Sequence, residues 1–113
     1  MTNSSKAKGD RAELEAARII NDLLGVPARR KLGAGRLDDT GDIDGVPDCT
    51  VQVVSRSTDV VSVAIVNKPL EAEHQARNAD TTYAVVFARI RGGHWRVVMT
   101  PEMWATYQRE VMT

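Results

Sequence analysis

The hydrophobic positions of residues 10–24 recur with helical spacing. At 100° per residue the apolar side chains share one arc of roughly 160°, and most charged side chains lie opposite. Glu13 is the exception, because it projects inside the apolar stripe. A carboxylate there is either paired, hydrogen-bonded or metal-bound, or it lies at the stripe edge and reaches water from the first helical turn. The apolar arc consists of Ala12, Ala16, Ala17, Ile19, Ile20, Leu23 and Leu24.

Short strands follow this helix. Gly25-Val26-Pro27 ends the helical pattern. We predict a first strand over residues 28–32, then a polar, glycine-containing loop over residues 33–40. Residues 43–46 and 50–55 are the next two predicted strands, and the second is rich in β-branched residues.

A second helix is predicted between residues 59 and 78. Pro69 interrupts the pattern, so we expect the helix to kink or restart there. Residues 60–66 taken alone fit a strand equally well. We favour the helix because residues 70–79 have a strongly helical composition.

The C-terminal third reads as a hairpin and a closing helix. Residues 82–90 and 95–99 are two predicted strands joined by Arg91-Gly92-Gly93-His94. Thr100-Pro101 marks the start of the last helix, with Thr100 as its N-cap. One face of this helix carries Trp104, Tyr107 and Val111. The order of elements predicts an α/β fold in which helices flank a mixed sheet.

Length and composition point to one soluble domain. The chain has 113 residues, of which 42% are hydrophobic and 27% charged. We expect a flexible polar arm over residues 1–8 and a single domain over residues 9–113. The sequence has no apolar run of membrane-spanning length and no signal-peptide core. The single cysteine, Cys49, fits a reducing cytoplasm, so we expect a cytoplasmic protein.

The net charge is zero, but the charges are unevenly distributed. Residues 1–36 hold eight Lys or Arg against four Asp or Glu, whereas residues 37–80 hold three against nine. An acidic middle beside a basic segment fits a metal site next to a phosphate-binding rim, and it also fits ordinary surface scatter. The best DNA-contact candidates in the basic segment are Arg29, Arg30, Lys31 and Arg36.

Several motifs, in this order and spacing, resemble the PD-(D/E)XK nuclease fold, and more narrowly the Holliday junction resolvase-like proteins of actinobacterial phages. An acidic Gly-Asp turn before a strand is one of them, because hard cations such as Mg²⁺ prefer carboxylate oxygens. Together the motifs touch most of residues 8–104. They are Lys8-Gly9-Asp10-Arg11-Ala12-Glu13, Arg29 to Arg36, Gly41-Asp42-Ile43-Asp44-Gly45-Val46-Pro47, Glu71 to Ala79 and Ala88 to Gly93.

The resemblance implies a restriction-endonuclease-like αβββαβ core and a homodimeric, Mg²⁺-dependent enzyme that cuts branched DNA in bacterial cells. By carry-over, Glu13 is the helix-borne acid and Asp42 the principal metal ligand, and we expect the two carboxylates on the same side of the sheet, close enough to share one ion or a water cluster. The Glu-x-Lys motif of such nucleases falls on Gln52 and Val54. A neutral amide binds Mg²⁺ more weakly than a carboxylate, and valine supplies no positive charge to position water. We therefore expect binding of branched or duplex DNA with weak or absent cleavage.

The sequence leaves two alternatives open. The first is an active structure-specific endonuclease whose site has migrated, with Asp44 or Asp48 as metal ligands and Lys68 or Arg56 as the cation. Asp44 and Asp48 also have a simple interpretation as turn residues. The second alternative is a protein-interaction module on the same fold that binds a host protein.

Overall fold

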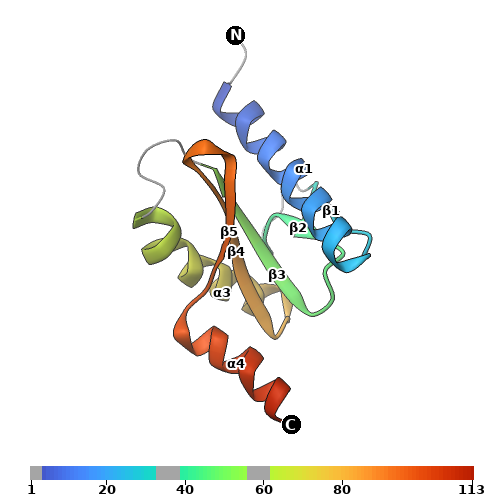
Figure 1. Cartoon of the computed structure of the whole chain (residues 1–113), viewed down its shortest axis with the longest axis vertical. Helices are drawn as coiled ribbons and strands as arrows, with labels where there is room; N and C mark the ends of the chain where they lie inside the picture. Colours follow the sequence, from blue (N-terminus) through green and yellow to red (C-terminus); the bar gives the residue numbers. More distant parts are fainter. Residues whose placement is uncertain (1–3, 33–38, 56–61) are drawn as a thin grey trace.

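The computed structural model of the chain describes residues 4–32, 39–55 and 62–113. In these ranges a helix is followed by three strands, a second helical segment, a fourth strand, a fifth strand and a closing helix (Figure 1). The elements are α1 (Ser4–Leu24), β1 (Arg29–Arg30), β2 (Ile43–Asp44), β3 (Cys49–Ser55), η1 (Val63–Asn67), α3 (Lys68–Ala79), β4 (Tyr83–Ile90), η2 (Arg91–Gly93), β5 (His94–Val98) and α4 (Pro101–Met112).

The five strands form one mixed sheet in the order β1-β2-β3-β4-β5. Strands β1, β2 and β3 pair antiparallel, and β4 and β5 form the predicted antiparallel hairpin. Strands β3 and β4 are parallel, with Val51 opposite Val85 and Val53 opposite Phe87. The crossover that parallel pairing requires is supplied by η1 and α3. The predicted α/β class with a mixed sheet and flanking helices is confirmed.

Two helices cover opposite faces of the sheet. On one face α1 packs Ala17 and Ile20 against Val51 of β3 and Val85 of β4. On the other face α3 packs Ala72 and Ala76 against alternate residues of the same strands. Because neighbouring strand residues point to opposite faces, β3 and β4 contribute side chains to both cores. The second core includes Val54, Ala84, Val86 and Ala88.

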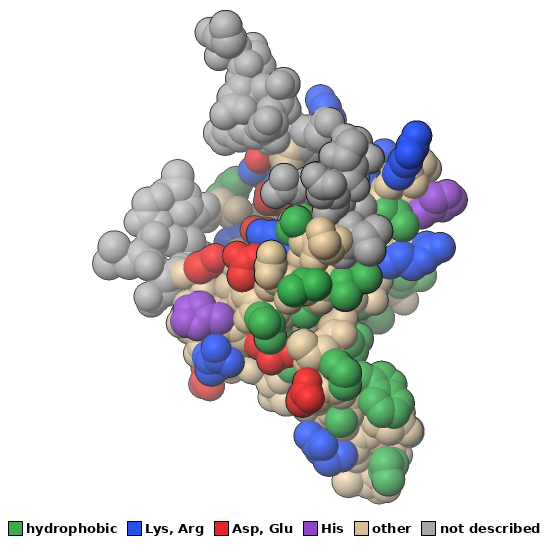
Figure 2. Space-filling view, turned by 90° about the vertical axis from the view of Figure 1, so that its left-hand side faces the viewer, with side chains coloured by type: hydrophobic (Ala, Val, Ile, Leu, Met, Phe, Trp, Pro, Cys, Tyr) green, Lys and Arg blue, Asp and Glu red, His purple; other side chains and the backbone are tan. Residues whose placement is uncertain are grey.

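The closing helix α4 extends beyond the sheet (Figure 1). As predicted, Thr100 caps it, and its hydroxyl oxygen accepts a hydrogen bond from the backbone N–H of Met103 at 3.0 Å. Met103 is buried, and the Tyr107 ring stacks on Tyr83 with 4.2 Å between ring centroids. Trp104 lies on the exposed side of α4, with 58% of its surface accessible. Figure 2 shows hydrophobic side chains on this helix, at the lower end of the view.

Several predicted boundaries were wrong. Helix α1 begins at Ser4, six residues before the predicted start at Asp10 and within the segment predicted to be a flexible arm. Strands β1 and β2 have only two residues each, because the chain pairs there only over Arg29–Arg30 and Ile43–Asp44.

The helical interpretation of the segment before Pro69 is confirmed from residue 62 onward. Residues 63–67 form one π-helical segment and α3 begins at Lys68, with Pro69 in its first turn, where a missing N–H costs nothing. The predicted helix start at Asp59 lies outside the described residues.

No helix in the described part of the chain is long and apolar enough to cross a membrane.

Candidate functional site

Asp42 is tied to β3 through both its backbone and its side chain. Its backbone N–H donates to the carbonyl of Val51 at 2.8 Å. Its Oδ2 accepts a hydrogen bond from the backbone N–H of Val53, also at 2.8 Å. The preceding Gly41 has φ +97°, and a Cβ there would lie 2.8 Å from Cγ2 of Thr50. The turn therefore requires glycine, and it places Asp42 alongside the β3 residue Gln52.

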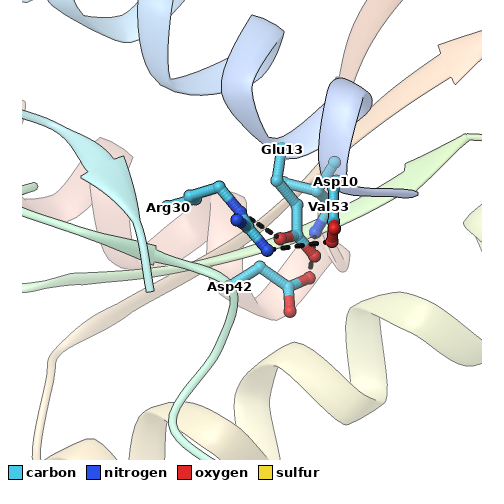
Figure 3. A network of polar contacts seen from close by, with 5 residues as sticks. All are labelled: Asp10, Glu13, Arg30, Asp42 and Val53. Atoms are coloured by element: carbon cyan, nitrogen blue, oxygen red, sulfur yellow. Dashed lines mark hydrogen bonds and ion pairs between the residues drawn. The ribbon is translucent and has the colours of Figure 1, made fainter. Parts of the chain in front are cut away.

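Glu13 reaches the same place from α1, together with Asp10 one turn earlier on the helix. Arg30 of β1 contacts both carboxylates (Figure 3). Its Nη2 is 2.8 Å from Oδ1 of Asp10, and its Nε is 3.4 Å from Oε1 of Glu13. We call Asp10, Glu13, Asp42 and Arg30 the acid–arginine cluster. Asp42 lies near enough to Glu13 for its charge to raise the pKa of Glu13, and Figure 3 shows its carboxylate beside those of Asp10 and Glu13.

Strand alternation explains why Arg30 and not Arg29 enters the cluster. Arg30 pairs with Ile43, which is buried against α1, so the Arg30 side chain also points toward α1. Arg29 points away and is exposed. The Lys31 side chain lies outside the cluster, and its Nζ donates hydrogen bonds to the carbonyl and hydroxyl oxygens of Thr40, each at 2.9 Å.

The basic residues predicted to contact DNA therefore do not form one exposed surface. Arg30 and Lys31 are engaged within the protein, and the side chain of Lys31 is only 11% accessible. Arg29 is exposed and has no ion pair among the described residues. Arg36 lies outside the described residues.

Burial and like charge raise the pKa of both acids that were predicted as site residues. For Glu13 the largest cause is burial, followed by the nearby charge of Asp42, and the hydrogen bond from Arg30 opposes both. For Asp42 burial again raises the pKa most, while the Val53 N–H and, more weakly, Lys68 lower it. The two carboxylates thus share a poorly solvated environment in which a positive charge is favourable.

The two β3 positions where a nuclease would carry Glu and Lys are packed into the protein. Gln52 is 8% accessible, and its Oε1 is buried without a hydrogen-bond partner among the described residues. Val54 is 5% accessible and belongs to the apolar core beside Ala64 and Ala72. Val54 is therefore a core residue, and an unpaired charge at this position would be unfavourable.

The residues considered as migrated site groups have other partners. Asp44 pairs with Lys31 at 3.3 Å. Asp48 accepts a hydrogen bond from the Thr82 N–H at 2.8 Å, as expected of a turn residue. Lys68 pairs with Glu71 at 3.0 Å and lies near enough to Asp42 to lower its pKa. Arg56 lies outside the described residues.

The cluster does not fit the Mg²⁺ ion that the resemblance implies. Mg²⁺ is held by carboxylate oxygens in a near-ideal octahedron. Here a guanidinium already binds Asp10 and Glu13, and the neighbouring strand offers the neutral amide of Gln52. Among the described residues, no group of three His, Cys, Asp or Glu side chains is placed to hold a metal ion.

Two features of this region were not predicted from the sequence. Asp10 joins the cluster, although its spacing of three residues from Glu13 on a helix places both on one face. A groove of about 510 Å³ is lined by residues of α1 and of the segment around β1, among them the exposed Arg18 and Arg29. It is lined also by Leu14, Ala17, Asn21, Ala28, Arg30 and Leu32.

Comparison with family models, with curated proteins and with solved structures finds no match to this chain.

Proposed function

We propose that this protein is a nuclease-like domain, resembling Holliday junction resolvase-like phage proteins, that binds branched or duplex DNA and cleaves it weakly or not at all. The observation that carries this proposal is that Glu13 and Asp42 lie near one another beside β3: the charge of Asp42 raises the pKa of Glu13, and Asp42 accepts a hydrogen bond from Val53. The order of helix, three strands, helix and strand, with β3 parallel to β4, supports the same assignment to the PD-(D/E)XK fold.

The absence of efficient cleavage follows from the chemistry of positions 52 and 54. Hydrolysis of a phosphodiester needs a metal to polarise the phosphate and a positive charge near the attacking water. Gln52 contributes no charge, and Val54 is an apolar core residue. Losing two preorganised charges costs many orders of magnitude in rate.

DNA contact is proposed at the border of the groove between α1 and β1. Arg18 and Arg29 are exposed there and are not used in ion pairs among the described residues. Exposed guanidinium groups bind phosphate oxygens and position the nucleic acid without reading its sequence. This revises the predicted contact set, because Arg30 and Lys31 are occupied within the protein.

The binding part of the proposal is tested by fluorescence anisotropy with a labelled four-way junction and a matched duplex in EDTA. We expect salt-dependent binding to the natural protein without added metal. The Arg18→Ser and Arg29→Ser variants should each weaken binding and reduce the slope of log K against log salt by about one. The matched control is Arg77→Ser, because Arg77 is exposed on α3, which covers the opposite face of the sheet from α1. Absence of binding to either DNA at low salt would contradict the proposal and favour a protein-interaction module.

A second candidate is an active endonuclease in which Lys68 supplies the positive charge from the start of α3. The influence of Lys68 on the pKa of Asp42 favours this candidate. Its pairing with Glu71 at 3.0 Å weakens it, because the ammonium group is already partly neutralised. The two candidates differ in whether the natural protein cuts a four-way junction.

We also infer that the protein forms a homodimer through α4. Trp104, Val111 and Met112 expose 58%, 77% and 75% of their surfaces on this helix. Exposed large hydrophobic side chains that gather on one element commonly mark an interface. A closed two-fold dimer is the commonest assembly of identical chains and would present two equivalent sites to a two-fold junction.

A further inference from the structure

Strand β1 forms one edge of the sheet (Figure 1). Lys31 donates its backbone N–H to the carbonyl of Asp42 at 2.8 Å, in the direction of β2. Because successive strand residues direct their backbone groups to opposite sides, the N–H and C=O of Arg30 point away from β2, toward the edge. Among the described residues, neither of these two groups has a hydrogen-bond partner. Backbone groups that face outward on an edge strand can pair with another extended chain.

Two residues before Arg30, a side chain already takes the place of such a chain. Ala28 faces the same edge as Arg30. Its backbone N–H donates to Oδ1 of Asn21 at 2.6 Å, and its carbonyl accepts a hydrogen bond from Nδ2 of Asn21 at 2.9 Å. The amide of Asn21 thus makes the two bonds that a neighbouring strand would make at Ala28. The edge is closed by α1 at Ala28 and open at Arg30.

The groove between α1 and β1 lies beside this open edge. Leu14 and Leu32 line it and expose 52% and 79% of their surfaces. Alternation places Leu32 on the same face of the extended segment as Ala28, which packs in the core under α1. In a strand added beside Arg30, a side chain that points toward α1 would therefore enter an apolar part of the groove. Burial of an apolar side chain there is favourable.

The charges around the groove select the kind of chain that fits. Arg18 and Arg29 are exposed and have no ion pair among the described residues. Arg29 lies on the opposite face of β1 from Arg30, so it would neighbour the residues that flank the apolar one, and carboxylates there would be favourable. A second copy of this chain fits poorly. Symmetric antiparallel pairing would bring Arg30 against its own copy and Arg29 against Lys31, and like charges on paired strands are destabilising.

We propose that the open edge of β1 binds an extended acidic peptide of another protein by strand addition. An apolar residue of the peptide lies opposite Arg30 and exchanges two backbone hydrogen bonds with it. Its side chain enters the groove beside Leu14 and Leu32, and an Asp or Glu on either side of it faces the arginines of the border. Bound peptide and DNA would exclude one another, because the proposed DNA contact also uses Arg18 and Arg29. This exclusion rests on the proposed function, whereas the peptide binding does not.

The test uses the full chain without DNA, so its failure is distinguishable from failure of the proposed function. The probe is the fluorescein-labelled peptide Gly-Ser-Glu-Leu-Glu-Ser-Gly, and anisotropy measures its affinity. Two N-methylated versions form a matched pair. Methylation at Leu removes the N–H that would face Arg30, and methylation at the second Glu removes an N–H that would face solvent. A version with Lys in place of both Glu residues tests the charge.

The unmodified peptide and the version methylated at Glu should bind with similar affinity. Methylation at Leu should weaken binding about tenfold or more, because a hydrogen bond is lost and the methyl group meets the Arg30 carbonyl. In hydrogen-exchange NMR, the bound peptide should slow exchange of the Arg30 amide. It should leave the Lys31 amide unchanged, because that group already donates to Asp42.

Protein variants at exposed positions locate the peptide in the groove. Leu32→Glu and Arg29→Glu each place a negative charge beside the acidic peptide and should weaken its binding about tenfold or more. Leu23→Glu is the matched control, because Leu23 is 75% exposed on α1 and does not line the groove. This variant should bind the peptide as the natural protein does.

Several results would overturn the inference. No binding of the acidic peptide at millimolar concentration is one, and equal affinities of the two N-methylated versions or of the Lys version are others. Equal weakening by Leu23→Glu and Leu32→Glu would place the peptide elsewhere. Protection of the Arg30 amide that rises with the concentration of the free protein would mean that a second copy occupies the edge. Protection of this amide by duplex DNA and by none of the peptides would assign the groove to nucleic acid.

Discussion

The carboxylate of Asp42 accepts a hydrogen bond from the backbone N–H of Val53 at 2.8 Å, so a side chain completes the edge of β3 where β2 has ended. Strand β2 pairs with β3 only through Ile43 and Val51. Beyond that pair, the Asp42 side chain replaces a neighbouring strand as acceptor. The same contact sets the direction of Asp42 toward Glu13, so sheet structure and candidate site depend on one residue.

The turn that positions Asp42 should tolerate no side chain at Gly41. A Cβ there would lie 2.8 Å from Cγ2 of Thr50, on a backbone with φ +97°. We expect Gly41→Ala to lower the free energy of unfolding by about 1–3 kcal/mol. Gly9→Ala is the control, because a Cβ at this helical position meets nothing within 4 Å and should stabilise α1 by about 0.5–1 kcal/mol. Urea denaturation measures both, and equal effects would contradict the prediction.

The stability of the natural protein should depend on pH through Asp42. Burial raises the pKa of this carboxyl in the folded state, so the folded protein holds its proton to higher pH than the unfolded chain. The cost of burying the charge is therefore present at neutral pH and is relieved as pH falls through the raised pKa. Asp42→Asn keeps an oxygen for the Val53 N–H and has no charge. Its stability relative to the natural protein should be highest near pH 7 and should fall toward pH 4.

Urea denaturation of both proteins across this pH range provides the test. A relative stability of Asp42→Asn that rises on acidification would mean that the folded state favours the ionised carboxylate. That outcome would show that the acid–arginine cluster and Lys68 outweigh the effect of burial on Asp42.

Replacing the exposed tryptophan of α4 should dissociate the inferred homodimer. Trp104 is 58% exposed and contributes little to the core of one chain. Trp104→Glu places a charge on the proposed interface, so light scattering at micromolar concentration should change from a dimer mass to a monomer mass. Arg109→Glu changes an exposed charge on the same helix and should leave the mass unchanged. A monomer mass for the natural protein would refute the dimer.

Introducing a lysine at position 54 should be costly. Val54 is 5% accessible and packs with Ala64, Ala72 and Val86. A buried lysine must either lose its charge or disrupt the core, and we expect Val54→Lys to destabilise the fold by about 3 kcal/mol or more. Val54→Met should cost about 1–2 kcal/mol. Similar unfolding midpoints for the two variants would show that position 54 has access to solvent.

The sequence was sufficient for the order of elements and for placing Glu13 and Asp42 in the same region. Period-3.6 and period-2 patterns distinguish helix from strand, and a carboxylate inside an apolar stripe indicates a partner. The sequence was insufficient for the use of the basic segment. The sequence gives no reason to distinguish Arg29, Arg30 and Lys31. In the structure, the pairing of Arg30 with Ile43 points the Arg30 side chain toward α1, whereas Arg29 points away from it. Pairing across residues far apart in the chain is a tertiary property, which local pattern does not encode.

The start of α1 was predicted wrongly, and the exposure of Trp104 was left open, for a related reason. Residues 4–9 lack the apolar stripe that marks residues 10–24, yet the helix begins at Ser4. Trp104 and Tyr107 differ by three positions on α4 and so lie near one another on its surface, but only Tyr107 meets a partner ring. Periodicity identifies an apolar face, and the neighbouring elements decide which part of it is covered.

Cleavage of a labelled four-way junction by the natural protein tests the central claim most directly. The account predicts binding in EDTA and, after addition of Mg²⁺ or Mn²⁺, no cleavage above that of an Asp42→Ala control, because Gln52 and Val54 supply no charge and Arg30 occupies the acid cluster. Robust, EDTA-sensitive cutting by the natural protein that Asp42→Ala abolishes would contradict the account. It would establish an active site with a migrated cation, for which Lys68 is the first residue to replace.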